Sequence, residues 1–188
     1  MKRRMILFTD IGDTIIDEGT EVRDVPGGVV RRAECIPGAR EALLALYGRG
    51  YTIAMVADGL VESFHNTMTQ HGLDHVFAAK AISEAVGAQK PDARMFQRAM
   101  DALGLSEADR GRVLMVGNNL ERDIAGARAF GIRSALLRWS PRYRHQWESE
   151  AERPDYVIDT PDELIALMDA LERGDRTGSG RGGVFPPI

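Results

Sequence analysis

Hydrophobic positions along the chain form two kinds of segment: short continuous apolar runs, and longer stretches in which apolar residues recur with helical spacing. The apolar runs predict buried strands at residues 5–9, 51–56, 113–116, 132–137 and 154–158. The helical stretches stand between them, mostly end at a glycine, and lie at residues 39–46, 60–71, 95–103, 120–130 and 161–171. Strands that alternate with helices predict an α/β fold of the doubly wound, Rossmann-like kind, in which helices cover both faces of a mainly parallel sheet.

Two segments interrupt this alternation. Residues 15–36 mix valines and charges around the turn-forming residues 26–28, which predicts a short β-hairpin flap over the sheet edge; a plain surface loop is the alternative. Residues 138–147 are basic and aromatic. They would contact a phosphate-bearing substrate or a partner subunit, or they would form a solvated loop with Trp139 against the core.

The composition limits the number of domains and the kinds of partner. With 188 residues, 44% of them hydrophobic, the chain suits one α/β domain over 1–173, followed by a flexible, Gly-rich tail at 174–188. A net charge of −4 provides no field that would attract nucleic acid, and no apolar run reaches the length of a membrane span. The single cysteine, Cys35, excludes an internal disulfide and favours a reducing, cytoplasmic location.

Polar residues follow the ends of the predicted strands. Asp10 comes directly after the first strand, and Lys90 precedes Pro91, which we place in the first turn of the next helix, while Asp123 stands in the first turn of the helix that starts at 120. The turns after two further strands contribute Ala57, Asp58 and Gly59, and Gly117, Asn118 and Asn119. Because parallel strands end at one edge of a sheet, we expect these residues to face one crevice, where they would supply a nucleophile, a cation and oxygen ligands for Mg²⁺.

Each of these residues also has an ordinary structural role open to it. Asp123 and Asn118 can cap a helix N-terminus, and Lys90 can be a solvated surface lysine. Their joint placement at matching strand ends favours a phosphoryl-transfer site over coincidence.

At these positions the sequence resembles the haloacid dehalogenase-like (HAD) superfamily, and the resemblance covers residues 5–171. The matching stretches are 10–14 (DIGDT, for a first motif that is usually DxDGT), 57–59 (second motif), 87–92 (GAQKPD, third motif) and 116–127 (fourth motif, GDxxxxDxxGA). Two positions depart from the motifs: Ala57 stands where the second motif carries Ser or Thr, and Asn118 replaces the first acid of the fourth motif.

The resemblance implies a Mg²⁺-dependent phosphatase that works through an aspartyl-phosphate. Asp10 would be the nucleophile, and Lys90 would stabilise the charge of the phosphoryl group and hold Asp10 in place. The metal would be held by Asp10, the Gly12 carbonyl, and Asn118 or Asp123. Backbone N–H groups of the second-motif turn would bind the phosphoryl group, and this turn consists of Ala57, Asp58 and Gly59.

The departures bear on proton transfer and on metal binding. Gly12 occupies the position where the family carries its second acid, which acts as general acid and base. Such proton-transfer groups raise the reaction rate by about 10²–10⁴-fold. Asp13 would substitute if the glycine let the turn swing its carboxylate inward; otherwise Asp13 caps the turn. Ala57 lacks the usual hydroxyl, and Asn118 offers Mg²⁺ a neutral oxygen. A non-catalytic, phosphate-binding or regulatory protein is therefore the alternative to a phosphatase.

The spacing of the motifs leaves no room for a cap domain. Only the flap at 15–36 separates the first motif from the second, and nothing is inserted between the second and the third. A capless crevice suits a larger phosphorylated substrate, or closure by a neighbouring subunit in a homo-oligomer, and argues against a dehalogenase. A phospho-acceptor receiver domain is disfavoured because its lysine would follow the acidic cluster, whereas Lys90 precedes Asp123.

Overall fold

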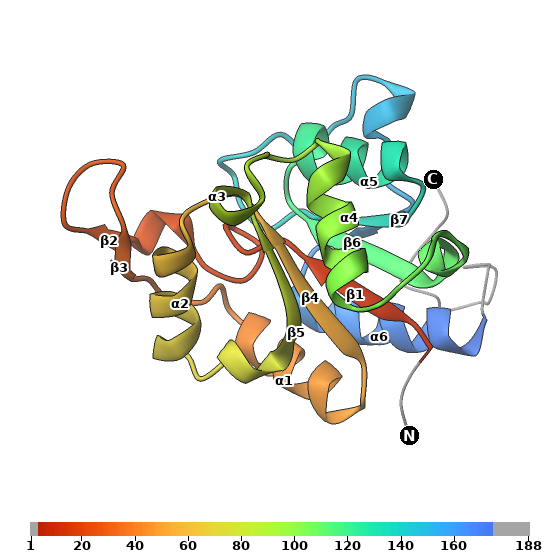
Figure 1. The fold of residues 1–188 in the computed structure, drawn as a ribbon, viewed down its shortest axis with the longest axis horizontal. Coiled ribbons are helices and arrows are strands. Elements are labelled where there is room, and N and C mark those ends of the chain that lie inside the picture. Colours follow the sequence, from red (N-terminus) through yellow and green to blue (C-terminus); the bar gives the residue numbers. More distant parts are fainter. Residues whose placement is uncertain (1–3, 175–188) are drawn as a thin grey trace.

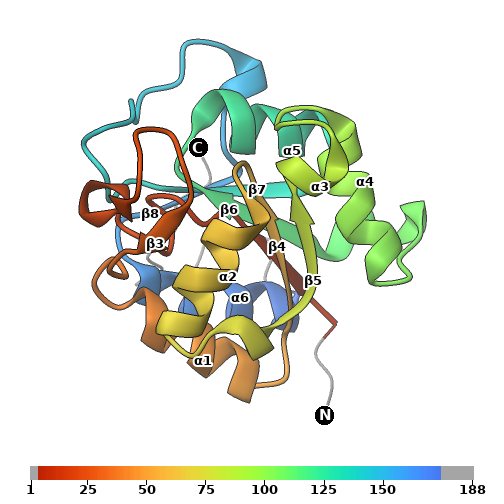
Figure 2. The same ribbon diagram turned by 60° about the vertical axis from the view of Figure 1, so that its left-hand side comes forward.

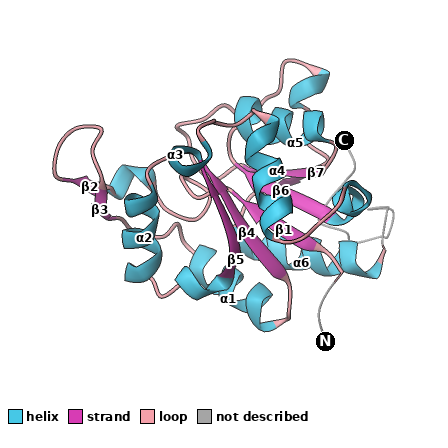
Figure 3. Cartoon of the chain, in the orientation of Figure 1, coloured by secondary structure: helices cyan, strands magenta, loops and turns pink. Residues whose placement is uncertain are grey.

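A central sheet of six strands organises the computed structural model, which describes residues 4–174 (Figures 1 and 3). The strand order is β5-β4-β1-β6-β7-β8, and every neighbouring pair is parallel. The strands are β1 (Ile6–Thr9), β4 (Thr52–Ala57), β5 (Phe77–Ile82), β6 (Val113–Gly117), β7 (Arg133–Leu137) and β8 (Tyr156–Ile158). The predicted α/β fold with a parallel sheet is confirmed, and the predicted tail beyond Gly174 lies outside the described residues.

Helices cover both faces of the sheet (Figure 2). They are α1 (Ala39–Gly48), α2 (Val61–Gln70), α3 (Ser83–Val86), α4 (Ala93–Ala102), α5 (Ala125–Phe130) and α6 (Pro161–Arg173), with shorter helical turns at Glu18–Thr20, Asp74–Val76, Glu107–Arg112, Leu120–Ile124 and Glu150–Glu152. On one face, α1, α2 and α6 enclose a core that includes Leu43, Met55 and Met68; on the other, α4 and α5 enclose Phe8 and Phe96. Within residues 4–174, no helix is both long and apolar enough to cross a bilayer.

The middle strand of the sheet carries the chain to the candidate site. All four residues of β1 are buried between the two helical layers. Directly after β1, the backbone N–H of Asp10 donates to the Val116 carbonyl on β6 at 3.0 Å. β4 and β6 flank β1 in parallel and end at Ala57 and Gly117. The sheet thus brings three strand ends to one edge, with Asp10 between the other two.

The edge strand β5 is an element that the hydrophobic pattern does not predict. Phe77 and Ala79 are buried, but Ala78 and Lys80 between and after them are exposed. Pairing with β4 on one side only leaves half of the strand facing solvent. Its alternating polarity therefore lacks the continuous apolar run that marks the interior strands.

The start of α4 differs from the expectation for Pro91. The helix begins at Ala93, and the Asp92 side chain caps it by accepting from the backbone N–H of Arg94 at 2.9 Å. Pro91 therefore lies ahead of the helix and not in its first turn. Lys90 accordingly stands on the loop that leads into α4.

The predicted flap is present as an antiparallel hairpin of β2 (Val22–Arg23) and β3 (Val30–Arg32). It projects from the body of the molecule beside α2, as Figure 1 shows. Two side chains of α2 hold it there: the Val30 N–H donates to Ser63 Oγ at 2.9 Å, and Asn66 Nδ2 donates to the Val30 carbonyl at 3.0 Å. Between β1 and β4, the chain adds only this hairpin, a helical turn and α1.

Candidate active site

Lys90 joins the carboxylates at the centre of the site. Its Nζ donates to Asp10 Oδ1 at 2.6 Å and to Asp123 Oδ1 at 2.7 Å. Lys90 is only 4% exposed and Asp123 only 1%, so neither is the solvated or merely capping residue that each could have been. The structure thereby brings together three of the residues singled out in the sequence, from the end of β1, the loop before α4 and the turn after β6.

Burial sets the electrostatics of this cluster. Removal from water raises the pKa of Asp10 to about 7, against the attraction of Lys90, and the nearby Asp123 adds to the rise. For Lys90, burial alone would lower the pKa, but attraction to Asp10, Asp123 and Asp58 raises it well above the ordinary range. Lys90 is therefore charged, and it is the principal group that stabilises the Asp10 carboxylate.

The turn after β4 supplies a third carboxylate. Asp58 Oδ1 accepts from the backbone N–H of Lys90 at 3.0 Å, and its other oxygen is buried with no hydrogen-bond partner. The expectation that the Gly59 N–H binds a phosphoryl group is wrong for this conformation, because that N–H donates to Ser83 Oγ at 2.9 Å. Ala57 is fully buried in the core. Of this turn, Asp58 is the residue that faces the site.

Two adjacent asparagines in the turn after β6 have different roles. Asn119 caps the following helical turn, since its Oδ1 accepts from the N–H groups of Glu121 and Arg122, each at 3.0 Å. The Asn118 side chain is buried, with 2% exposure, and its Nδ2 has no hydrogen-bond partner. Asp123 Oδ2 accepts from the Asn119 N–H at 3.0 Å. Both oxygens of Asp123 are therefore engaged, and Asn118 is the residue of this turn with an unpaired polar atom.

Only some of the predicted ligands are placed to hold a divalent cation. Asp10 and Asp123 share one buried ammonium, which leaves an excess of negative charge that a cation would offset, whereas Asp58 lies 3.7 Å from Arg122 Nη1. No group of three His, Cys, Asp or Glu side chains within 4–174 is arranged to hold a metal. The remaining donors are Asp10, the Gly12 carbonyl and Asn118, a sparse set suited to Mg²⁺, which keeps several waters. Asp123 is better described as a partner of Lys90 than as a ligand.

The expectation that Asp13 replaces the missing proton-transfer acid is not supported. Asp13 has a φ of 50°, so the turn is as unusual as expected, but its carboxylate points away and is fully buried. It accepts from Ser140 Oγ at 2.7 Å, from Arg142 Nε at 2.7 Å and Nη2 at 2.5 Å, and from the Glu18 N–H at 2.9 Å. Although burial opposes its charge, the Arg142 and Ser140 hydrogen bonds hold the pKa of Asp13 below its usual value.

Glu18 is the site residue that the sequence reasoning missed. It stands in the helical turn Glu18–Thr20, half-buried, and its Oε2 accepts from the Tyr143 hydroxyl at 3.0 Å. Burial, and then repulsion from Asp13, raise the pKa of the Glu18 carboxyl. The signal in the sequence was indirect: a glycine at position 12 makes room for a side chain from elsewhere.

The basic and aromatic loop at 138–147 proves to be a support for the site. Arg142 also pairs with Asp17 at 2.5 Å, Tyr143 holds Glu18, and Trp139 packs against the core cluster around β1. Trp139 is tucked against the core, as the second alternative predicts, while its neighbours fix residues 13–18, a role that neither alternative included.

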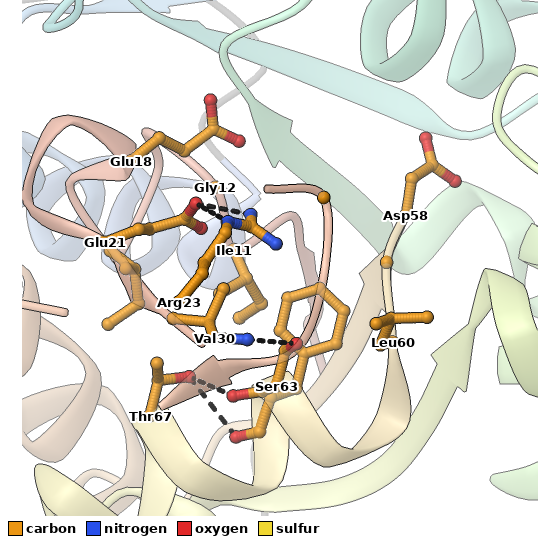
Figure 4. Close-up of a pocket in the computed structure, with 14 residues that line it drawn as sticks. Ile11, Gly12, Glu18, Glu21, Arg23, Val30, Asp58, Leu60, Ser63 and Thr67 are labelled. Atoms are coloured by element: carbon orange, nitrogen blue, oxygen red, sulfur yellow. Dashed lines mark hydrogen bonds and ion pairs between the residues drawn. The ribbon is translucent and has the colours of Figure 1, made fainter. Parts of the chain in front are cut away.

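A pocket of about 200 Å³ lies beside the site, between the flap, α2 and the turn after β1 (Figure 4). Its wall is apolar at Ile11, Leu60 and Phe64, and polar at Glu18 and Arg23. In Figure 4 the Gly12 turn lies between Glu18 and Asp58, whose carboxylates stand at the rim. A small substrate moiety could therefore enter beside the Asp10 cluster.

A family model described as haloacid dehalogenase-like hydrolase matches residues 3–131. The chain belongs to the haloacid dehalogenase-like hydrolases. The sequence resemblance is thus confirmed, and the short connections make this hydrolase a capless member.

The curated relatives of this hydrolase include phosphatases and dehalogenases. Glyceraldehyde 3-phosphate phosphatase of Pyrococcus furiosus is 31% identical over 73% of this chain and 55% of its own. Phosphoserine phosphatase of Thermus thermophilus is 32% identical over 75% and 53%, and haloacetate dehalogenase H-2 of a Moraxella species is 28% identical over 81% and 64%. The hydrolase therefore spans a little over half the length of these relatives.

Solved structures agree on the fold. The HAD hydrolase YfnB of Bacillus subtilis, determined with bound magnesium, superposes with a TM-score of 0.71 at 17% identity, covering 89% of this chain and all of the other. A dehalogenase captured as an intermediate complex gives a TM-score of 0.65 at 25% identity, over 73% of this chain and 58% of its own. The Rossmann-like HAD fold is therefore shared with both of these structures.

Proposed function

We propose that this hydrolase is a Mg²⁺-dependent phosphatase that works through an aspartyl-phosphate on Asp10. The single observation that carries the proposal is the buried Lys90, which bridges Asp10 and Asp123 at 2.6 and 2.7 Å. A fixed cation beside a carboxylate that stands on a strand end suits attack on phosphorus, where negative charge is transferred and must be stabilised. Two of the curated relatives named above are phosphatases.

The residues of the chain divide the work of the first step. Oδ2 of Asp10, which accepts only a long hydrogen bond of 3.5 Å from Thr14 Oγ1, would attack the phosphorus, while Oδ1 stays bound to Lys90. Lys90 would favour the ionised form of Asp10 against the effect of burial and would also face the phosphoryl oxygens, and Asp123 would hold Lys90 in position. Asp10, the Gly12 carbonyl and Asn118 would hold Mg²⁺, whose bound charge would offset that of the phosphoryl group.

The pocket indicates what the phosphate is attached to. At about 200 Å³, it suits a small organic moiety with an apolar part against Leu60 and Phe64 and a polar part near Arg23. The capless crevice beyond it leaves room for a larger phosphorylated molecule or for a second subunit. Dehalogenation is the second hydrolase reaction in the family, but the two carboxylates that share the single ammonium of Lys90 favour hydrolysis of a phosphate ester with a bound metal ion.

Turnover of an aryl phosphate with and without Mg²⁺ tests the proposal. Wild type should hydrolyse the ester only with Mg²⁺, and Asp10→Asn should abolish turnover and phosphoenzyme formation. Asp74→Asn is the matched control, because Asp74 pairs with Lys80 on the surface and is remote from the site. Inactivity of wild type toward a broad panel of phosphate esters, combined with measurable phosphate binding, would instead favour a phosphate-binding regulatory protein.

A further inference from the structure

We propose that Glu18 is the catalytic proton-transfer residue of this site, taking the place that Gly12 leaves empty. The inference rests on the proposed phosphatase function. It assigns to a residue eight positions beyond the nucleophile the task of protonating the leaving group and of activating the hydrolytic water.

The space around Gly12 is the first observation. A Cβ built on Gly12 would collide with the Glu18 carboxyl group: Oε1 lies inside contact distance, and the carboxyl carbon lies 3.0 Å away. Gly12 does not adopt a left-handed φ, unlike nine other glycines of residues 4–174. Backbone conformation therefore does not demand a glycine here, and the Glu18 carboxylate fills the volume that a side chain at position 12 would start to occupy.

The hydrogen bonds of the other acids exclude them from the role. Asp13 is held by Ser140 and Arg142, and Asp123 has both oxygens engaged by Lys90 and the Asn119 N–H. Asp58 accepts from the Lys90 N–H with one oxygen, and its second oxygen is buried and forms an ion pair with Arg122 Nη1 at 3.7 Å. Glu18 and Asp58 both line the pocket, but only Glu18 has an oxygen, Oε1, directed at the Gly12 turn.

Tyr143 positions the Glu18 carboxyl group. Its hydroxyl donates to Oε2 at 3.0 Å, so the two carboxyl oxygens have different surroundings. The Asp13 carboxylate, clamped by Arg142, also accepts from the Glu18 N–H and thereby fixes the start of the helical turn. Figure 4 shows Glu18 at the rim of the pocket beside Gly12. The carboxyl group is thus held from two directions next to the turn that carries the nucleophile.

Glu18 gives up a proton in the first step of the reaction and regains one in the second. In the first, Asp10 forms an O–P bond, the P–O bond to the leaving group breaks, and the Glu18 carboxyl proton passes to the leaving oxygen. In the second, the Glu18 carboxylate takes a proton from water as the water oxygen bonds to phosphorus and the Asp10 O–P bond breaks. Asp10 and Glu18 return to their starting states, and the products are an alcohol and inorganic phosphate.

Glu18→Gln keeps the shape of the side chain and removes the proton transfer. With Mg²⁺ and ³²P-labelled dinitrophenyl phosphate, whose leaving group needs no proton, the variant should still form the acid-stable phosphoenzyme but fail to hydrolyse it. We expect steady-state turnover to fall about 10²–10⁴-fold and the labelled fraction to rise above that of wild type. With phenyl phosphate, a poor leaving group, formation of the phosphoenzyme should be slow as well. Glu34→Gln, an exposed acid on the same segment, is the matched control.

The outcomes separate the two proposals. If Glu18→Gln turns over at the wild-type rate with no accumulation of label, the inference on Glu18 is wrong and the proposed function stands. If wild type forms no labelled phosphoenzyme and hydrolyses neither ester, the proposed function fails, and the role of Glu18 fails with it.

A relocated acid distinguishes catalysis from support of the fold. Glu18→Ala alone should be as slow as Glu18→Gln for want of the acid, and in Gly12→Asp alone the new side chain would displace the carboxyl group of Glu18. The double variant Gly12→Asp/Glu18→Ala should regain at least tenfold over Glu18→Ala, with melting curves showing that all three proteins are folded. No gain in a folded double variant would overturn the inference.

Discussion

At the scale of single residues, the site combines groups that a strand pattern can locate with one that it cannot. Asp10 and Asp123 stand next to strand ends, and the shared edge of a parallel sheet brings them to Lys90. Glu18 does not stand next to a strand end, because it reaches the site from a loop. Of the two roles open to Asp13, the structure fits the capping one, since Asp13 accepts from the Glu18 N–H, but its partner Arg142, 129 positions along the chain, could not be predicted from the turn itself.

The raised pKa of Asp10 has a consequence for stability. The folded state holds the Asp10 proton up to about pH 7, whereas the ordinary value is 3.8, so stability falls as pH rises between these two values. In EDTA at pH 8, Asp10→Asn should therefore be more stable than wild type by at least about 1 kcal/mol, a melting temperature about 2–4 °C higher. The difference should shrink toward pH 5, where the folded wild type holds the proton.

Thermal melts of both proteins across pH 5–8 check this expectation, with Asp74→Asn as the surface control. An advantage of Asp10→Asn that stayed constant over the whole range would contradict the assignment of the shift to this carboxyl. Added Mg²⁺ should narrow the difference at pH 8, because a bound cation would offset the buried charge of wild type only.

At the scale of elements, the loop at 138–147 acts as a brace between the sheet and the turn after β1. Residues 13–18 carry no strand of their own and depend on contacts from this loop. The sequence indicated a contact loop from its Arg and aromatic content, but not its target. The residues that a loop contacts depend on tertiary packing, whereas the period of the hydrophobic residues predicts strands and helices.

Arg142→Ala should release this brace. Asp13 would be left buried with hydrogen bonds only from Ser140 and the Glu18 N–H, at a cost of about 1–3 kcal/mol in the free energy of unfolding. Turnover should fall as well, since Glu18 follows the same turn. Because the pKa of Asp13 is held below its usual value, the deficit should be complete at pH 7 and shrink below about pH 4.

Urea denaturation and turnover measurements on the same variant check both effects. Arg138→Ala is the matched control, since Arg138 pairs with Asp159 on the surface of the same loop region. Arg142→Lys should not restore wild-type behaviour, because an ammonium cannot reproduce the two guanidinium hydrogen bonds. Equal stability of Arg142→Ala and Arg138→Ala would contradict the brace.

At the scale of the whole molecule, two hydrophobic layers share one sheet. Leu43 and Met68 lie in the layer of α1, α2 and α6, and Phe96 lies in the layer of α4 and α5. Since the strands belong to both layers, neither can unfold while the other keeps its sheet. The alternation of helices and strands was enough to predict this arrangement, and only the half-exposed edge strand β5 escaped it.

Phe96→Ala should therefore weaken the entire molecule. Phe96 is fully buried and stacks on Phe130 with ring centroids 5.5 Å apart, so we expect a loss of about 3–5 kcal/mol. Tryptophan fluorescence, which reports on Trp139 in the opposite layer and on Trp147 beside Leu120, Ile124 and Leu136, and far-UV circular dichroism should give one coincident transition. Two separate transitions would show that the layers unfold independently. Tyr47→Ala, at an exposed position, is the control.

The bonds from Ser63 and Asn66 that fasten the flap to α2 bear on how this protein would acquire a new substrate range. Enzymes that close a cap over their substrate must keep two conformations in balance, so a change in the cap alters closure as well as recognition. Here, one wall of the pocket is a hairpin tied to a helix of the folded core. Substitutions at a few positions of that helix would reshape the pocket without disturbing a hinge. The substrate selectivity of this protein can therefore evolve independently of its conformational dynamics.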